Sequence, residues 1–192
     1  LEIIDFGNNA FDFFIPKGKG ELQMPLNCDV DNSGNIYVAD AMRKQIVIFD
    51  HKGDYLSCLG EKENFKPTDV QMKDNKIWVA NLDDHKINVY SNDSLKKLLF
   101  SFPDAIEGSS EYLYSPTNLC VTDDKVFVTD MGDFRIKVYT RTGTFLKSIG
   151  SAGTGIGQFV RPKGIAVDRD TNIYVVDASF ENVQIFNYKG QF

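Results

Sequence analysis

The stretch from Asp29 to Asp40 carries the side chains best suited to binding a metal ion. Numbered from Asp29, it places oxygen-bearing residues at positions 1, 3, 5 and 12 and Gly34 at position 6, which is the pattern of an EF-hand calcium loop. An EF-hand loop lies between two helices, however, whereas both flanks of this stretch are rich in residues typical of β-strands. We therefore interpret Gly34-Asn35 as a hairpin turn and predict no calcium site.

The two histidines, His51 and His85, are the other candidates for metal binding or catalysis. A zinc site gathers three or four protein ligands, and neither histidine has an evident nucleophile as a partner. The cysteines, Cys28, Cys58 and Cys120, show no CxxC spacing, and we interpret them as small buried hydrophobic residues. The sequence therefore predicts no catalytic residues, no metal ion and no cofactor.

The chain contains four copies of one sequence repeat, and the fold of these repeats must position the side chains named above. Each copy runs from a proline through a short apolar strand and a turn to a second strand that ends in Asp or Asn. The copies span Pro25–Asp40, Pro67–Asn81, Pro116–Asp130 and Pro162–Asp177, so that successive prolines are 42, 49 and 46 residues apart. A period of about 40–50 residues is typical of the blades of a β-propeller.

A third strand follows a short polar loop in every copy, at Gln45–Phe49, Lys86–Tyr90, Arg135–Tyr139 and Asn182–Phe186. A turn and a fourth strand come next, as at Tyr55–Leu59 and Phe145–Ile149. These segments are rich in Val, Ile, Tyr and Phe, and several alternate apolar with polar residues. The pattern predicts an all-β fold of four-stranded antiparallel blades, with strands a, b, c and d in each blade.

The strand directions define two faces of the predicted molecule. Because neighbouring strands run in opposite directions, the a–b and c–d turns lie on one face, and the b–c loops and d–a connections lie on the other. His51 and His85 then lie on opposite faces. We expect the b–c loops and d–a connections to be the longer and more varied set, and therefore to carry the function.

Acidic or amide residues end strand b in all four copies, at Asp40, Asn81, Asp130 and Asp177. A ring of metal ligands is one interpretation of this recurrence. We favour a structural role, in which these side chains accept backbone N–H bonds and fix the b–c turn.

The repeats resemble the NHL family. The phrase is most complete in the fourth copy, where residues 161–168 read RPKGIAVD, residues 172–177 read NIYVVD and residues 183–186 read VQIF. The second copy departs most, with Asn81 in place of Asp and no glycine turn. The resemblance covers essentially the whole chain. It implies a β-propeller similar to bacterial six-bladed NHL propellers, with a location in the cell envelope or periplasm.

The repeats divide the chain into blades at residues 24–64, 65–113 and 114–158, and a blade without its last strand at residues 159–192. Residues 1–23 are predicted to hold the outer strand of a preceding blade plus a connection, since Leu1–Gly7 resembles Leu146–Gly150. We expect the chain to be a segment of a six-bladed propeller, whose open edges would promote self-association. The alternative is a closed four-bladed ring, in which Leu1–Gly7 pairs with the last blade.

Aromatic, basic and polar side chains on the b–c and d–a face are the binding candidates. The b–c loops supply Arg43, Lys44, His85, Phe134, Arg135 and Phe180, and the starts of strands a supply Thr68, Asp69, Thr117, Asn118 and Lys163. We expect a non-catalytic scaffold that binds a protein or a small ligand. A metal-dependent enzyme, like the lyases among NHL-like propellers, is the first alternative, and an RNA-binding NHL domain is the second.

The charge of the chain bears on these alternatives. The net charge is -6, and acidic residues such as Asp83, Asp84 and Asp133 interrupt the basic residues of the same loops. A phosphate-binding surface needs a basic excess, so nucleic acid is a disfavoured partner. No segment approaches the roughly 18 apolar residues of a membrane-spanning helix.

Overall fold

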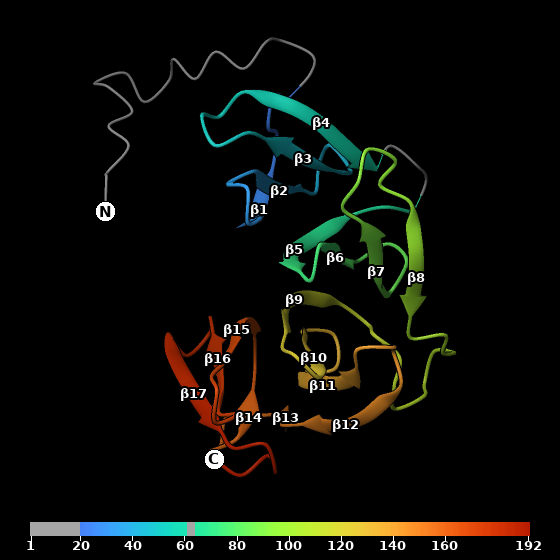
Figure 1. The fold of residues 1–192 in the computed structure, drawn as a ribbon. Coiled ribbons are helices and arrows are strands. Elements are labelled where there is room, and N and C mark those ends of the chain that lie inside the picture. The colour runs from blue at the N-terminus through green and yellow to red at the C-terminus, as the bar shows by residue number, and fades with distance from the viewer. Residues whose placement is uncertain (1–19, 61–63) are drawn as a thin grey trace, which may run out of the picture.

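The computed structural model describes residues 20–60 and 64–192, and Figure 1 shows them as an arc of small sheets. The predicted strand at Leu1–Gly7 lies outside the described residues. The strands are β1 (Pro25–Val30), β2 (Ile36–Asp40), β3 (Gln45–Phe49), β4 (Tyr55–Gly60), β5 (Pro67–Lys73), β6 (Lys76–Asn81), β7 (Lys86–Ser91), β8 (Leu98–Phe102), β9 (Pro116–Val121), β10 (Lys125–Asp130), β11 (Arg135–Thr140), β12 (Phe145–Ile149), β13 (Ser151–Ala152), β14 (Gln158–Phe159), β15 (Pro162–Val167), β16 (Ile173–Asp177) and β17 (Asn182–Phe186). In this part of the chain, no helix has the length and apolar character needed to cross a bilayer.

Three of the sheets are four-stranded antiparallel blades with their strands in chain order. Blade 1 is β1–β4, blade 2 is β5–β8 and blade 3 is β9–β12. Blade 4 contains β15, β16 and β17, and the connection before it holds the short parallel pair β13 and β14. The predicted fold class, an all-β propeller built of antiparallel blades, is confirmed.

The hydrophobic core lies between successive blades. The first strands β1, β5, β9 and β15 line the inside of the arc, and each contacts the next (Figure 1). Between blades 1 and 2, for example, Tyr37, Ile46 and Ile48 pack against Ile77 and Val79. Similar clusters fill the spaces between blades 2 and 3 and between blades 3 and 4. Because a middle blade is covered on both faces, its second strand carries a continuous apolar run, as at residues 77–80 of β6.

The acidic and amide residues at the ends of the second strands are buried hydrogen-bond acceptors. The carboxylate of Asp177 accepts the N–H groups of Val160 at 2.8 Å, Arg161 at 3.2 Å and Ser179 at 3.0 Å. Burial raises the pKa of Asp177, but these N–H donors outweigh it and leave the pKa below its usual value.

Asp40, Asn81 and Asp130, at the same position in the other blades, also bind backbone groups. The predicted contact with the b–c turn is confirmed for the three aspartates, Asp40, Asp130 and Asp177. Each also accepts N–H groups from the segment that leads into its own blade. Asn81 makes only the second kind of contact, since it accepts Lys66 N–H at 2.8 Å and donates to Asn64 O at 2.9 Å.

The expectation of longer and more varied b–c loops is wrong. The b–c turn has four residues in every blade, at 41–44, 82–85, 131–134 and 178–181. The last residue of each turn has a left-handed backbone, with φ of 57° at Lys44, 55° at His85, 54° at Phe134 and 52° at Glu181. The variation lies in the d–a connections, which span residues 61–66, 103–115 and 150–161.

Side chains on the inner strands also tie neighbouring blades together. Asp29 Oδ2 accepts Met72 N–H at 2.7 Å, and Gln71 Oε1 accepts Val121 N–H at 2.6 Å. Cys120 occupies the same position in blade 3 and accepts the corresponding N–H of blade 4, while burial raises the pKa of its thiol. The three cysteines form no disulfide, and the prediction that they are buried is wrong, since Cys28 is exposed and Cys58 and Cys120 are partly exposed.

Candidate binding surface

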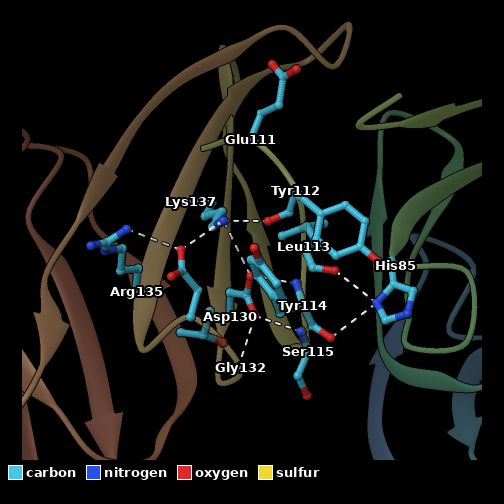
Figure 2. Close-up of polar contacts among 12 residues, drawn as sticks. His85, Glu111, Tyr112, Leu113, Tyr114, Ser115, Asp130, Gly132, Arg135 and Lys137 are labelled. Atoms are coloured by element: carbon cyan, nitrogen blue, oxygen red, sulfur yellow. Dashed lines mark hydrogen bonds and ion pairs between the residues drawn. The ribbon is translucent and has the colours of Figure 1, made fainter. Parts of the chain in front are cut away.

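The connection between blades 2 and 3, residues 103–115, crosses the face that carries the b–c turns, and His85 anchors its end (Figure 2). His85 Nδ1 lies 3.0 Å from the carbonyl oxygen of Leu113 and 3.1 Å from that of Tyr114. Because both neighbours are acceptors, Nδ1 carries a proton and donates it. The imidazole also stacks on Tyr112, with ring centroids 5.2 Å apart. His85 therefore holds an aromatic segment against blade 2.

Lys137 holds the same segment from the side of blade 3 (Figure 2). Its side chain is fully buried, and its Nζ lies 2.9 Å from Asp133 Oδ2 and 3.7 Å from Asp130 Oδ2. The ammonium also donates to the carbonyl oxygen of Tyr112 and lies 5.4 Å from the ring centroid of Tyr114. A buried charge is tolerated when it is paired and hydrogen-bonded, and Lys137 meets both conditions.

Asp130 completes the attachment of the connection. Its carboxylate accepts Tyr114 N–H at 2.9 Å, Ser115 N–H at 2.7 Å and Gly132 N–H at 3.1 Å. Tyr139 donates its hydroxyl to the carbonyl oxygen of Glu111 at 2.5 Å. Burial, together with nearby carboxylates, raises the pKa of Tyr139, so this hydroxyl stays a donor. Residues 111–115 thus form a fixed aromatic ledge between blades 2 and 3.

Three predicted site residues lie beside this ledge or on the adjoining turn of blade 4. Arg135, whose side chain is 42% exposed, has its Nη1 3.5 Å from Asp133 Oδ2. Figure 2 shows Arg135 and His85 on opposite sides of the connection. Phe134 packs against the core between blades 3 and 4, and Phe180 is 37% exposed.

The predicted residues of blade 1 make contacts between segments. Arg43 donates to the carbonyl oxygen of Glu21 and, through Nε, to Gln45 Oε1 at 3.2 Å. Lys44 Nζ lies 3.6 Å from Asp83 Oδ2, so this exposed ion pair joins the b–c turns of blades 1 and 2.

The predicted residues at the second position of the inner strands act between blades. Thr68 Oγ1 donates to Pro116 O of the next blade at 2.9 Å, and Thr117 Oγ1 makes the equivalent contact with Pro162 O at 3.4 Å. Lys163 occupies the same position in blade 4 and is exposed. The two threonines are therefore part of the blade junctions.

Asp69 and Asn118 lie inside the arc, beside a cavity of about 210 Å³ lined by all four inner strands. Asp69 accepts N–H groups from Val70 at 2.8 Å and Leu119 at 2.8 Å, and the Asn118 amide at 3.4 Å. Burial dominates and raises the pKa of Asp69 to about 7, with the Asp29 charge adding to it. This carboxyl group joins blades 2 and 3 and borders the central cavity.

The calcium-like stretch is indeed a turn. Asp31 Oδ1 accepts Ser33 N–H at 2.8 Å and Asn35 N–H at 2.9 Å, and its Oδ2 accepts the Tyr37 hydroxyl at 3.1 Å. Asp29 and Asp40 are bonded elsewhere, to Met72 and to the chain before β1. Within the described residues, no group of three or more His, Cys, Asp and Glu side chains is placed to hold a metal ion.

Sequence reasoning missed the parts of this face that lie outside the repeat. Tyr112, Tyr114 and Ile106 belong to the connection 103–115, and Ile156 belongs to the connection 150–161. Ile106 is 82% exposed and Ile156 is 80% exposed. The available signal was an isolated isoleucine within each long connection. Neither isoleucine lies at a repeat position that packs between blades.

Comparisons with known proteins agree with this fold. The sequence model of a family described as "6-bladed beta-propeller" matches residues 105–192, which include blades 3 and 4. No curated protein matches the chain in sequence.

Solved structures with the same fold include three proteins of low sequence identity. A streptogramin B lyase superposes with a TM-score of 0.68 at 15% identity, covering 87% of this chain and 52% of its own. The virginiamycin B lyase from Staphylococcus aureus gives 0.61 at 12% identity, covering 85% and 55%. A protein of unknown function from Bacteroides caccae gives 0.65 at 13% identity, covering 88% and 58%.

The chain spans a little over half the length of each of these structures. At such identities the likeness concerns the fold alone. The geometry and the comparisons together identify the chain as a β-propeller.

Proposed function

We propose that the chain is part of a six-bladed NHL-type propeller that binds a protein partner through the face of its b–c turns and d–a connections. The observation that carries the proposal is a set of apolar side chains exposed on that face: Met42 at 62%, Ile106 at 82%, Ile156 at 80% and Phe180 at 37%. Exposed apolar side chains on one face of a soluble protein mark interaction surfaces. The resemblance to NHL repeats favours a bacterial, extracytoplasmic setting.

The distribution of these side chains favours a macromolecular partner. Met42 and Phe180 lie in the b–c turns of blades 1 and 4, while Ile106 and Ile156 lie in the connections before blades 3 and 4. They therefore extend across several blades, which is more than a small molecule can contact at once. The aromatic ledge beside His85 adds amphipathic side chains of the kind enriched at interfaces.

The charges on this face support a protein rather than a nucleic acid. Exposed Lys44 and half-buried Arg135 lie beside Asp83 and Asp133, so the polar rim has mixed charge. An RNA-binding surface would need an excess of basic residues, and the chain has a net charge of -6.

Site-specific photo-crosslinking tests the proposal. We expect benzoylphenylalanine in place of Ile106 or Ile156 to give the same discrete protein adduct in cells that produce the chain. The matched control is Leu146, which is 42% exposed but lies at the start of β12, the outer strand of blade 3, away from the b–c turns. Arg135→Glu should weaken the adduct at both positions. Adducts of equal yield from Leu146, or none from Ile106 and Ile156, would refute the binding face.

A further inference from the structure

A second candidate site lies on the outer side of the arc, between blades 1 and 2. A groove of about 930 Å³ runs along β7, with β4 on one side and β8 and the c–d turn of blade 2 on the other. Asn88 of β7 lines this groove, and its side chain is 6% exposed. The Asn88 side chain is hydrogen-bonded to Tyr90, but its Oδ1 atom is buried and has no hydrogen-bond partner among the described residues. A buried amide oxygen without a donor costs about 1–3 kcal/mol, so a bound molecule that donates a hydrogen bond to Asn88 would be stabilised here.

The residues equivalent to Asn88 in the other three blades show which contacts a side chain makes at this position. Asn88 pairs with Val79 at the centre of its blade, and the same register places Val47, Lys137 and Gln184 at the centres of blades 1, 3 and 4. In each of those blades, the chain that leads into the blade covers this residue. Lys137 donates to Tyr112 O, and Val47 packs against Leu22.

Gln184 is the closest chemical equivalent of Asn88. Its Oε1 accepts Gly157 N–H at 3.1 Å, and its Nε2 donates to Gln158 O at 2.8 Å. One side-chain amide thus binds two backbone groups of an extended segment, because a peptide offers both a donor and an acceptor. The connection into blade 2, residues 61–66, is about half as long as those into blades 3 and 4. The hydrogen bonds of its residues 64–66 go to Asn81 and Leu82.

The rest of the groove defines the chemistry of the occupant. Phe65 and Tyr90 form an apolar floor, with their rings edge to face at 6.4 Å, and Leu59 packs beside them. At the end formed by the c–d turn, Lys96 and Lys97 line the groove. Lys96 Nζ donates to Asp93 O at 3.5 Å, and neither lysine forms an ion pair within the described residues. β4 is the edge strand of blade 1, so a strand beside it would find unpaired backbone groups.

We propose that this groove binds an extended peptide segment of a partner protein, with Asn88 hydrogen-bonding its backbone, Phe65 and Leu59 receiving an apolar side chain, and Lys96 and Lys97 pairing with a carboxylate. This is a site separate from the b–c and d–a face. The mode of binding copies the contact that Gln184 makes with residues 157–158 of the same chain.

Selection from a library of displayed random decapeptides against the 192-residue chain tests the site. Enriched peptides should combine an apolar residue with an acidic residue, and synthetic copies should bind the chain in a titration. Asn88→Leu should weaken their binding at least tenfold, and Lys97→Glu should weaken it as well. Ile106→Glu, on the b–c and d–a face, should leave it unchanged, which separates this site from the proposed function.

The stability of two matched variants shows whether Asn88 acts as an anchor or as a structural residue. Asn88→Leu removes a buried amide oxygen that has no donor, at the loss of the one side-chain hydrogen bond to Tyr90, and should leave the melting temperature nearly unchanged. Gln184→Leu, at the same place in blade 4, breaks two formed bonds and should lower the melting temperature without affecting the peptides. The proposal is overturned if no peptide is enriched, if Asn88→Leu binds peptides as the native chain does, or if Ile106→Glu abolishes binding.

Discussion

The aspartates that end the second strands hold two segments of backbone at once. Asp177 accepts N–H groups from Val160 and Arg161 before the blade and from Ser179 in the b–c turn. One side chain therefore fixes both the path into a blade and the turn within it. This explains why an acceptor recurs at this position in all four copies. A bound metal ion is not needed to explain the recurrence.

Replacing Asp177 should reveal this role. Asp177→Ala leaves three backbone N–H groups without their acceptor in a buried site, and we expect a loss of roughly 2–4 kcal/mol in the free energy of unfolding. Asp177→Asn keeps one acceptor oxygen, as Asn81 does in blade 2, and should lose clearly less. Urea unfolding followed by tryptophan fluorescence measures both. Equal losses for the two variants would show that the charge, rather than the acceptor geometry, is what matters.

Asp69 should make the stability depend on pH near neutrality. Its pKa is raised to about 7 in the folded chain, mainly by burial, from the ordinary value of 3.8 for an aspartate. Between these values the folded state binds a proton that the unfolded state has lost, so stability falls as the pH rises towards 7. From pH 5 to pH 7 the loss attributable to Asp69 is about 2 kcal/mol.

The comparison with Asp69→Asn isolates this effect. The variant cannot ionise at position 69, so the difference in unfolding free energy between it and the native chain should change by this amount across the same range. Urea titrations of both proteins at pH 5, 6 and 7 provide the measurement. A difference that stays constant with pH would mean that the three N–H donors keep Asp69 ionised throughout.

At the scale of elements, the repeat phrase predicts the blades and the connections modify them. The predicted third strand at Lys86–Tyr90 agrees with β7, Lys86–Ser91, because apolar Ile87 and Val89 alternate with polar neighbours within the segment itself. The aromatic ledge could not be predicted in this way. Lys137 meets Tyr112 across 25 residues of chain, and no period relates the two. Val47, Asn88, Lys137 and Gln184 occupy equivalent positions in the four blades. The reason for their different residue types becomes clear only when the connections that precede the blades are placed in the structure.

The attachment of the ledge depends on Lys137. Lys137→Met leaves Asp130 and Asp133 beside each other without their buried cation, and removes the donor to Tyr112 O. Breaking a buried ion pair from one side costs about 3–5 kcal/mol, and we expect a loss of stability in this range. Amide exchange should accelerate first in residues 111–115. Lys163→Met, an exposed lysine of blade 4, serves as the control and should change neither measurement. Unchanged exchange in Lys137→Met would show that Asp130 and His85 hold the ledge alone.

At the scale of the whole molecule, blades 1 to 3 each cover their forward face with the next blade, and blade 4 differs. Val176, Val183 and Ile185 on that face are 42%, 55% and 48% exposed. Their equivalents in blade 3, Thr129, Ile136 and Val138, are fully buried against blade 4. The same surface chemistry that joins two blades is thus presented to solvent at one end of the arc. Such a face suits a further blade, in keeping with the family description of six blades.

The 192-residue chain should therefore self-associate through blade 4. Burying apolar surface contributes about 25 cal/mol per Å², and the exposed Val183 and Ile185 offer that gain to a second copy. Val183→Lys combined with Ile185→Lys should shift sedimentation-equilibrium profiles towards the monomer, with little change in the melting temperature because both side chains are already exposed. Leu99→Lys combined with Leu146→Lys changes two exposed leucines of the outer strands, 47% and 42% exposed, and should leave the association as it is. If the native chain is monomeric at high micromolar concentration, or if the two double variants behave alike, the blade 4 face is not the surface through which the copies meet.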